Sequence, residues 1–288
     1  MPSNKLIMVT LDGCRYDTAV DELGFLGHLV EKGKAARFRV KSELPSNSRP
    51  LYQVLLTGTP PCENGIVSNL SIRLSAQNSL FHLVRQAGGR TAAVAYHWVS
   101  ELYQQAPFSY QHDRIQHQLE KPIQHGMFYF EDQYPDSHVF AEANYLLETY
   151  QPDFLYIHSM NIDDIGHKFT AASAEYRAVV GKVDIILAEC LPAWLEAGYQ
   201  IIVTADHGLD EFGHHGGTRS GVRDVPLFIL SEKVETGISA QQIPQLMVAP
   251  LACHLMGIMP SDDMQTFDES LFDGEREKGA ARSESIDD

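Results

Sequence analysis

The chain has 288 residues, of which 44% are hydrophobic and 21% charged, proportions that are typical of a globular protein. Its 38 acidic residues outnumber the 22 basic ones, and the formal net charge is −16. A protein of this charge repels polyanions, so we expect its partner to be neither nucleic acid nor an anionic membrane surface. A small anionic ligand stays compatible with this charge where bound dications reverse it locally.

The length is sufficient for one large α/β domain with at most a modest cap. The four cysteines lie far apart without a CxxC pair, so the sequence predicts neither a disulfide framework nor a structural zinc ribbon. The apolar run at 6–11 is too short for a signal peptide, and no stretch approaches the roughly 18 apolar residues of a membrane span. We therefore expect a cytoplasmic protein with reduced thiols.

The predicted elements are strands and helices that alternate along most of the chain. In order, the first are a strand at 5–11, a helix at 23–34, a strand at 36–42, helices at 49–56 and 79–86, and a strand at 91–96. Residues 98–135 show little periodicity, which indicates a long loop or a small cap. The later elements are a helix at 137–149, a strand at 154–158, a helix at 171–195, strands at 200–204 and 225–230, and a last helix at 242–255.

This alternation predicts an α/β fold with a mainly parallel central sheet and helices on both faces. We expect one domain over 1–265, whereas the acidic, glycine- and serine-bearing segment 266–288 is predicted to be disordered. In parallel sheets the functional site lies beyond the carboxyl ends of the strands. Polar residues follow three of the predicted strands, at Asp12, at 158–163 and at 206–207. The sequence therefore predicts that distant segments meet at one edge of the sheet.

Ser48 is predicted to stand at the N-terminus of a helix that has Pro50 in its first turn. The positive end of the helix dipole and its free amides favour both an alkoxide and a bound phosphate there. A serine in this position is also an ordinary helix cap, and the residue alone does not separate the two roles. Asn69 has two roles open in the same way, as a hydrogen-bond donor to a phosphoryl oxygen or as a turn residue.

Carboxylates and imidazoles gather in four short segments of the sequence. These are Asp12-Gly13, Asp163 with His167 four residues on, Asp206-His207-Gly208, and Gly213-His214-His215-Gly216-Gly217. Each segment alone is also explained as an ordinary turn or strand end, but together they supply three carboxylates and three histidines when one histidine of the pair His214-His215 is counted. Such a ligand set suits two divalent ions of the zinc type, with manganese as an alternative. His158 lies within its predicted strand and is expected to be a buried supporting residue.

The ordered motifs DGxR, a Ser or Thr ahead of a TG turn, GIVxN, DxxGH, DHG and HGG resemble the alkaline phosphatase superfamily, and most closely its nucleotide pyrophosphatase/phosphodiesterase branch. By this resemblance Asp12, Ser48, Asp206 and His207 surround one metal ion. Asp163, His167 and His215 surround the other, with His214 as an alternative to His215. The resemblance also implies that Ser48 is the nucleophile and that Asn69 holds a phosphoryl oxygen. The branch usually has threonine as its nucleophile, and most of its members are longer than this chain.

The resemblance implies a two-metal phosphoester hydrolase that acts through a phosphoseryl intermediate on Ser48. The first expectation is a phosphodiesterase or nucleotide pyrophosphatase acting on a small, nucleotide-like ester. A phosphomonoesterase or phosphomutase of the same superfamily is the alternative, and a catalytically silent metal-binding interaction module is the alternative from another class. His97, Trp98 and His125 belong to an aromatic-rich stretch that could bind substrate, although ordinary packing explains such a stretch equally well.

Overall fold

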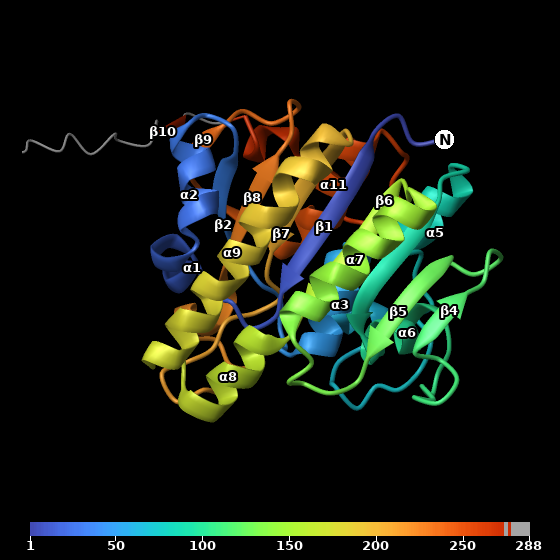
Figure 1. The fold of residues 1–288 in the computed structure, drawn as a ribbon, viewed down its shortest axis with the longest axis horizontal. Coiled ribbons are helices and arrows are strands. Elements are labelled where there is room, and N and C mark those ends of the chain that lie inside the picture. Colours follow the sequence, from blue (N-terminus) through green and yellow to red (C-terminus); the bar gives the residue numbers. More distant parts are fainter. Residues whose placement is uncertain (274–275, 278–288) are drawn as a thin grey trace, which may run out of the picture.

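The computed structural model describes residues 1–273 and 276–277, and its elements form a single layered α/β unit (Figure 1). In chain order the elements are β1 (Lys5–Leu11), α1 (Tyr16–Glu22), α2 (Gly24–Glu31), β2 (Ala36–Lys41), α3 (Ser48–Thr57), α4 (Pro61–Asn64), α5 (Leu80–Gln86), β3 (Thr91–Tyr96), α6 (His97–Tyr103), β4 (Ile115–His117), β5 (His125–Tyr129) and α7 (Asp136–Tyr150). There follow β6 (Phe154–Ser159), α8 (Asn161–Phe169), α9 (Ala174–Glu196), β7 (Tyr199–Thr204), α10 (Ser220–Arg223), β8 (Asp224–Leu230), β9 (Gly237–Pro244), η1 (Gln245–Met247), α11 (Val248–Met256), η2 (Glu269–Leu271) and β10 (Arg276–Glu277).

The strands form one sheet in the order β10-β9-β2-β8-β7-β1-β6-β3-β5-β4. Within the described part of the chain, β4, β8 and β10 run antiparallel to their neighbours, and the other pairings are parallel. Helices α7 and α9 lie in front of the sheet in Figure 1, α3 and α11 lie behind it, and α8 lies below the carboxyl end of β1. The prediction of a mainly parallel sheet covered on both faces is therefore confirmed.

The centre of the sheet is strand β1, which is apolar along its length and is buried apart from its first residue. It pairs in register with both neighbours, since Thr10 lies opposite His158 of β6 and opposite Thr204 of β7. Asp12 follows Thr10 by two residues, as Asp206 follows Thr204. The register therefore brings these two carboxylates to the same level at the carboxyl edge.

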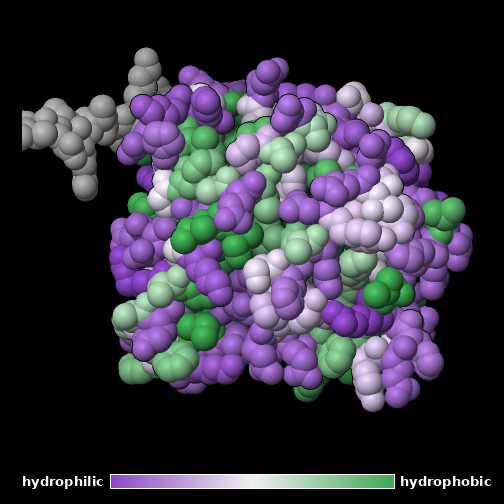
Figure 2. Space-filling view, viewed as in Figure 1, coloured by the Kyte–Doolittle hydropathy of each residue, from purple (hydrophilic) through white to green (hydrophobic). Residues whose placement is uncertain are grey.

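The surface that α7 and α9 present is mainly hydrophilic, with smaller hydrophobic areas between the polar residues (Figure 2). Among the helices of the described residues, none is both long and apolar enough to cross a membrane.

The prediction of a loop or cap at 98–135 is wrong for much of that segment. Helix α6 occupies its start, and β5 pairs with β3 as a strand of the main sheet, with Ala92 opposite His125. The alternation in β5 is hidden because both faces of this strand are covered, so four of its five residues are buried. Backbone pairing with neighbours, and not an intrinsic pattern, makes this segment a strand.

The C-terminal boundaries also differ from those expected. The last helix was predicted at 242–255, but β9 continues to Pro244 beside β2 and α11 begins only at Val248. The predicted disordered segment starts too early, because Phe272 is 2% exposed and its ring packs edge-on against Phe38 at 5.3 Å. The prediction of disorder is thus wrong for 266–273, and the rest of that tail, apart from β10, lies outside the described residues.

Candidate active site

The residues that the motifs single out as metal ligands come together at the carboxyl edge of the sheet. Two groups of side chains there have ligand atoms within 4.8 Å of one another. The first group contains Asp12, Asp206 and His207, and the second contains Asp163, His167 and His215. Elements far apart in the sequence supply both groups, as the position of the motifs after strands predicts.

The first group is entirely buried, and its members come from the ends of β1 and β7. The Nε2 atom of His207 lies 3.5 Å from Asp12 Oδ1 and 3.4 Å from Asp206 Oδ2. The Nδ1 atom of the same ring lies 3.1 Å from the carbonyl oxygen of Gly208, and this contact directs Nε2 toward the carboxylates.

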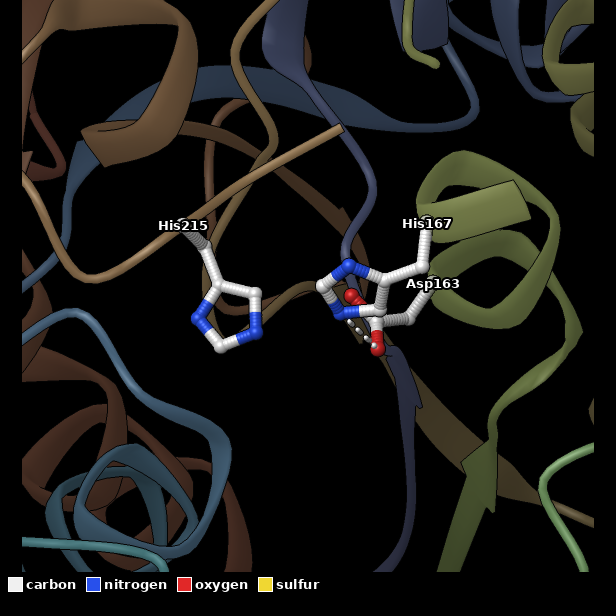
Figure 3. A group of neighbouring side chains, drawn as sticks. All are labelled: Asp163, His167 and His215. Carbon is white, nitrogen blue, oxygen red and sulfur yellow. Dashed lines mark ion pairs between the residues drawn. The ribbon is translucent and has the colours of Figure 1, made fainter. Parts of the chain in front are cut away.

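The second group joins helix α8 to the loop that follows Gly213 (Figure 3). Asp163 and His167 are one helical turn apart on α8, and His167 Nε2 lies 3.2 Å from Asp163 Oδ2. His215 approaches from the loop, its ring centroid 5.1 Å from that of His167. Carbonyl oxygens of Gly213 and Ser46 lie 2.7 and 2.9 Å from Nδ1 of His167 and His215 respectively. Both imidazoles are therefore held with Nε2 available, a common arrangement for metal-binding histidines.

Two contacts place the groups side by side. The rings of His207 and His215 are stacked with their centroids 4.0 Å apart. The backbone at Gly13, directly after Asp12, lies against Asp163, and a Cβ atom at Gly13 would lie 2.8 Å from Asp163. Gly13 also has a positive φ of 74°. Glycine is required there for both reasons. His214 is exposed and belongs to neither group, so the structure brings His215 into the cluster and leaves His214 outside it.

The carboxylates of the two groups have buried oxygen atoms without hydrogen-bond partners. These atoms are Oδ1 of Asp12, Oδ1 of Asp163 and Oδ2 of Asp206. A buried carboxylate oxygen without a donor is costly, and it becomes favourable when a cation coordinates it. Carboxylate and imidazole together form a ligand set for zinc-type ions. The residues present therefore fit two divalent cations, and the buried first group is of the kind typical of a metal site.

The electrostatics of the metal-free cluster point the same way. Burial, together with the charge of Asp163, holds the pKa of Asp12 well above its ordinary value. Burial and the charge of Asp12 do the same to the pKa of Asp206. Burial also lowers the pKa of His207 well below its usual value, with the neighbouring His215 adding to the effect. Ionised carboxylates and neutral imidazoles in this space therefore require a positive charge among them.

Ser48 stands at the N-terminus of α3, with its Oγ atom 3.1 Å from Nε2 of His207. The expectation that Ser48 caps the helix is wrong, because Asn47 holds the cap position and Ser48 is the first helical residue. Ser48 is 4% exposed, and its hydroxyl faces the carboxylate cluster. Asn69 is half-buried, and its Oδ1 accepts a hydrogen bond of 3.1 Å from the backbone amide of Arg49. The amide nitrogen of Asn69 remains free to donate beside Ser48.

The three residues proposed to bind substrate have different positions. Trp98 packs against Tyr52, with ring centroids 6.3 Å apart, and so lies one side chain away from Asp12. His97 is half-buried beside Trp98, and burial lowers its pKa to about 4. His125 pairs with Ala92 at the opposite end of the sheet and stacks on Tyr150 at 3.7 Å. His125 is therefore excluded from this site, because β5 carries it to the amino edge.

Two tyrosines next to the candidate metal ligands were not predicted. The hydroxyl of Tyr52 donates to Asp12 Oδ2, and the hydroxyl of Tyr176 donates to the carbonyl oxygen of Gly13 over 2.6 Å. Tyr52 follows Ser48 by four residues on one helix, which is a signal that the sequence does contain. Tyr176 belongs to α9 and has no such signal, since the packing of α9 against α8 and α1 brings it close.

His167 gives the metal-free chain an expected dependence of stability on pH. Its hydrogen bond to Asp163, opposed by partial burial, raises the pKa of His167 from 6.5 to about 9. A pKa raised in the folded state means that protonated His167 stabilises the fold fully below 6.5, and that this contribution is lost as the pH rises through about 9. Because the His167 side chain is 42% exposed and solvent screens its charge, we expect the Tm of the chelated protein to fall by only about one or two degrees over this range. Thermal denaturation at a series of pH values measures it.

The matched variant for this prediction is His167→Gln, which cannot take up the proton. Because other groups also titrate, the quantity to compare is the difference in Tm between the two chelated proteins at each pH. The difference should shrink from pH 6.5 to pH 9, the interval between the ordinary and the raised pKa. A difference that stays constant across the interval would show that His167 is not protonated in the folded chain.

Comparisons with known proteins agree with this geometry. Residues 6–218 match the Type I phosphodiesterase / nucleotide pyrophosphatase family. The chain is 21% identical over 243 residues to the human GPI ethanolamine phosphate transferase 2, catalytic subunit, and 24% identical over 242 residues to GPI ethanolamine phosphate transferase 2 of Candida glabrata. These alignments cover 81% and 80% of this chain but 24% and 28% of those proteins, so the chain spans about a quarter of the length of the curated relatives it matches.

Solved structures show the same fold at low sequence identity. Human ectonucleotide pyrophosphatase / phosphodiesterase 5 matches with a TM-score of 0.71 and 14% identity, over 94% of this chain and 100% of that chain. An inactive variant of the murine protein, in complex with AMP, matches with a TM-score of 0.70 and 13% identity, over 92% of this chain and 97% of that one. Since the family match extends over residues 6–218, most of its length, the chain belongs to the Type I phosphodiesterase / nucleotide pyrophosphatase family of the alkaline phosphatase superfamily.

Proposed function

We propose that this chain cleaves small phosphodiesters by means of two divalent cations, with zinc as the first candidate and manganese as the second, and that Ser48 is the nucleophile. The observation that carries the proposal is the position of the Ser48 hydroxyl, 3.1 Å from His207 Nε2. That nitrogen lies 3.5 and 3.4 Å from buried oxygens of Asp12 and Asp206 that have no hydrogen-bond donors. The family membership supports the same chemistry.

In this proposal some residues bind the cations, and Ser48 is also the nucleophile. Asp12, Ser48, Asp206 and His207 would hold one cation, and Asp163, His167 and His215 the other. When bound, the cations supply positive charge that lowers the pKa of the serine hydroxyl and offsets the charge of the phosphoryl oxygens. The N-terminus of α3 adds its partial positive charge at the same point, because Ser48 is the first residue of that helix.

Ser48 Oγ would attack phosphorus and release its proton to solvent, while the bond from phosphorus to the leaving oxygen breaks. The free amide nitrogen of Asn69 would donate to a phosphoryl oxygen. Attack of water on the phosphoseryl group then restores Ser48 and completes a hydrolysis. Attack of an alcohol in place of water would make the chain a transferase, and the similarity to GPI ethanolamine phosphate transferases supports that second candidate.

Two arginines could in principle bind a terminal phosphate group, but both have other partners. Arg49 is 1% exposed and lies 2.6 Å from Glu101 Oε2, with its guanidinium over the ring of Trp98. Arg15 is paired with Asp17 at 2.5 Å and donates to the carbonyl oxygen of Leu209. A dianionic monoester would thus find no free guanidinium here, whereas the single negative charge of a diester needs none.

We therefore expect a higher kcat/KM for phosphodiesters than for monoesters. The comparison uses bis-p-nitrophenyl phosphate, a p-nitrophenyl ester of a nucleoside monophosphate, and p-nitrophenyl phosphate under one set of conditions. The AMP complex of the murine relative supports including a nucleotide ester. A tenfold advantage of the monoester, worth about 1.4 kcal/mol of transition-state stabilisation, would overturn the diester assignment in favour of a phosphatase.

The same assay separates hydrolysis from transfer when an alcohol such as ethanolamine is added. Release of p-nitrophenol with free nucleotide as the product supports hydrolysis, and a nucleotide ester of the added alcohol supports transfer. If protein with two bound ions turned over none of these esters, the remaining hypothesis would be that the chain is a catalytically silent metal-binding interaction module.

A further inference from the structure

The two oxygen atoms of Asp12 have unequal surroundings. Oδ2 accepts from two donors, the hydroxyl of Tyr52 and Nε2 of His158, the latter 3.0 Å away. Oδ1 has no hydrogen-bond partner. A carboxylate oxygen that accepts two hydrogen bonds has both of its lone pairs occupied. Of the two oxygens, only Oδ1 is left for a cation.

The second ring nitrogen of His158 is held by Tyr129. The Tyr129 hydroxyl lies 3.0 Å from His158 Nδ1 and 2.9 Å from the carbonyl oxygen of the same residue. An ionised Asp12 requires a proton on Nε2, so in the neutral ring Nδ1 is an acceptor, and the single Tyr129 proton is shared between Nδ1 and the carbonyl oxygen of His158. Tyr129 therefore holds the ring of His158 in the orientation in which Nε2 faces Asp12.

The other donor links Asp12 to the helix that carries the nucleophile. Tyr52 lies one turn beyond Ser48 on α3, and its side chain is fully buried. Its ring contacts the ring of His158 edge-on, with centroids 4.6 Å apart. The two donors thus support each other, and neither can turn away from Oδ2 without disturbing the other.

We propose that Tyr52, His158 and Tyr129 are positioning residues that saturate Oδ2 of Asp12 and present Oδ1 to a cation. The inference rests on the proposed function, because it requires a cation at the group formed by Asp12, Asp206 and His207. The three residues act through Asp12 and set the affinity of this group alone. The second group, at Asp163, makes no contact with them among the hydrogen bonds of the cluster.

The test is the zinc affinity of the full-length chain, measured by competition with a chromogenic chelator. Tyr52→Phe and His158→Leu should each weaken one of the two ions by about 10–100-fold, the effect typical of lost partners of metal ligands, and leave the other within about threefold. His158→Gln keeps an N–H donor near the position of Nε2 and should restore most of the affinity. Tyr129→Phe should give an intermediate loss, because the ring of His158 then loses the hydroxyl that holds its orientation.

Tyr156→Phe is the matched control, since Tyr156 is a fully buried tyrosine of the same strand, two residues before His158, whose hydroxyl has no bond to Asp12. It should leave both zinc affinities unchanged. Denaturation of the metal-free variants shows whether the fold is retained, and Tyr52→Phe provides the readout if His158→Leu does not fold. Equal weakening of both ions, or a loss with Tyr156→Phe as large as with Tyr52→Phe, would overturn the inference. So would unchanged affinity in every variant of a chain that binds two ions. A wild-type chain that binds no zinc would overturn the proposed function instead.

Discussion

Replacing Ser48 by alanine should lower kcat for phosphodiester cleavage by about three to six orders of magnitude. The hydroxyl would form the bond to phosphorus, so without it the reaction keeps only what the cations and Asn69 contribute. The cost to the fold is small, since the side chain loses a single hydrogen bond, at 3.1 Å to His207, worth about 1 kcal/mol. Steady-state kinetics, together with circular dichroism and elemental analysis of the same sample, measure these effects.

Ser48→Thr is the matched control, because it keeps a hydroxyl at the same position and the related branch commonly uses threonine there. We expect this variant to retain much of the wild-type turnover. Rapid quenching should also trap a phosphoryl group on Ser48 of the wild-type chain and none on the alanine variant. If Ser48→Ala kept more than about a tenth of the activity, another nucleophile would have to be sought.

The second large effect is expected on metal removal. The wild-type chain should retain two zinc ions through desalting, and chelation should abolish turnover until zinc is restored. His167→Ala should leave one ion per chain and lower kcat/KM by about a hundredfold or more, since one of the two positive charges at the phosphoryl group is lost. The His167 side chain is 42% exposed, so its truncation spares the core.

His214→Ala is the control for the metal experiment. His214 is exposed and lies next to His215, so the variant removes a neighbouring imidazole without touching either ligand group. We expect it to keep two ions and nearly full activity. Activity that is indifferent to chelator, together with only traces of transition metal in the wild-type chain, would contradict the two-metal proposal.

The sheet and its polar edge could be predicted because the information is local. The apolar runs at Lys5–Leu11 and Tyr199–Thr204 are long enough to indicate buried strands, and Asp12 and Asp206 follow these runs directly. Buried parallel strands tolerate few polar residues, so a carboxylate at such a strand end stands out. The pairing of the two strands then needs only the rule that the carboxyl ends meet at one edge.

The remaining features depend on contacts that a single sequence does not encode locally. The end of strand β9, residues 242–244, was predicted as the start of a helix, since only its pairing with β2 identifies it as a strand. Helix α8 was not predicted, because its segment contains Gly166 and few apolar residues. His125 was grouped with its aromatic neighbours, although β5 spans the sheet and places Tyr129 at the edge where the two ligand groups lie and His125 at the other.

The matching registers of β1 with β6 and β7 have a consequence for how the site tolerates change. Asp12 and Asp206 lie two residues beyond paired positions of adjacent strands, so backbone hydrogen bonding, at an interstrand spacing of about 4.8 Å, sets their separation. Substitutions in the apolar interior alter the stability of the domain without altering this spacing. Insertions in the surface loops leave it untouched as well. A scaffold of this kind can exchange the loops around the edge, and with them the ester that is bound, while the spacing of its two central carboxylates stays constant.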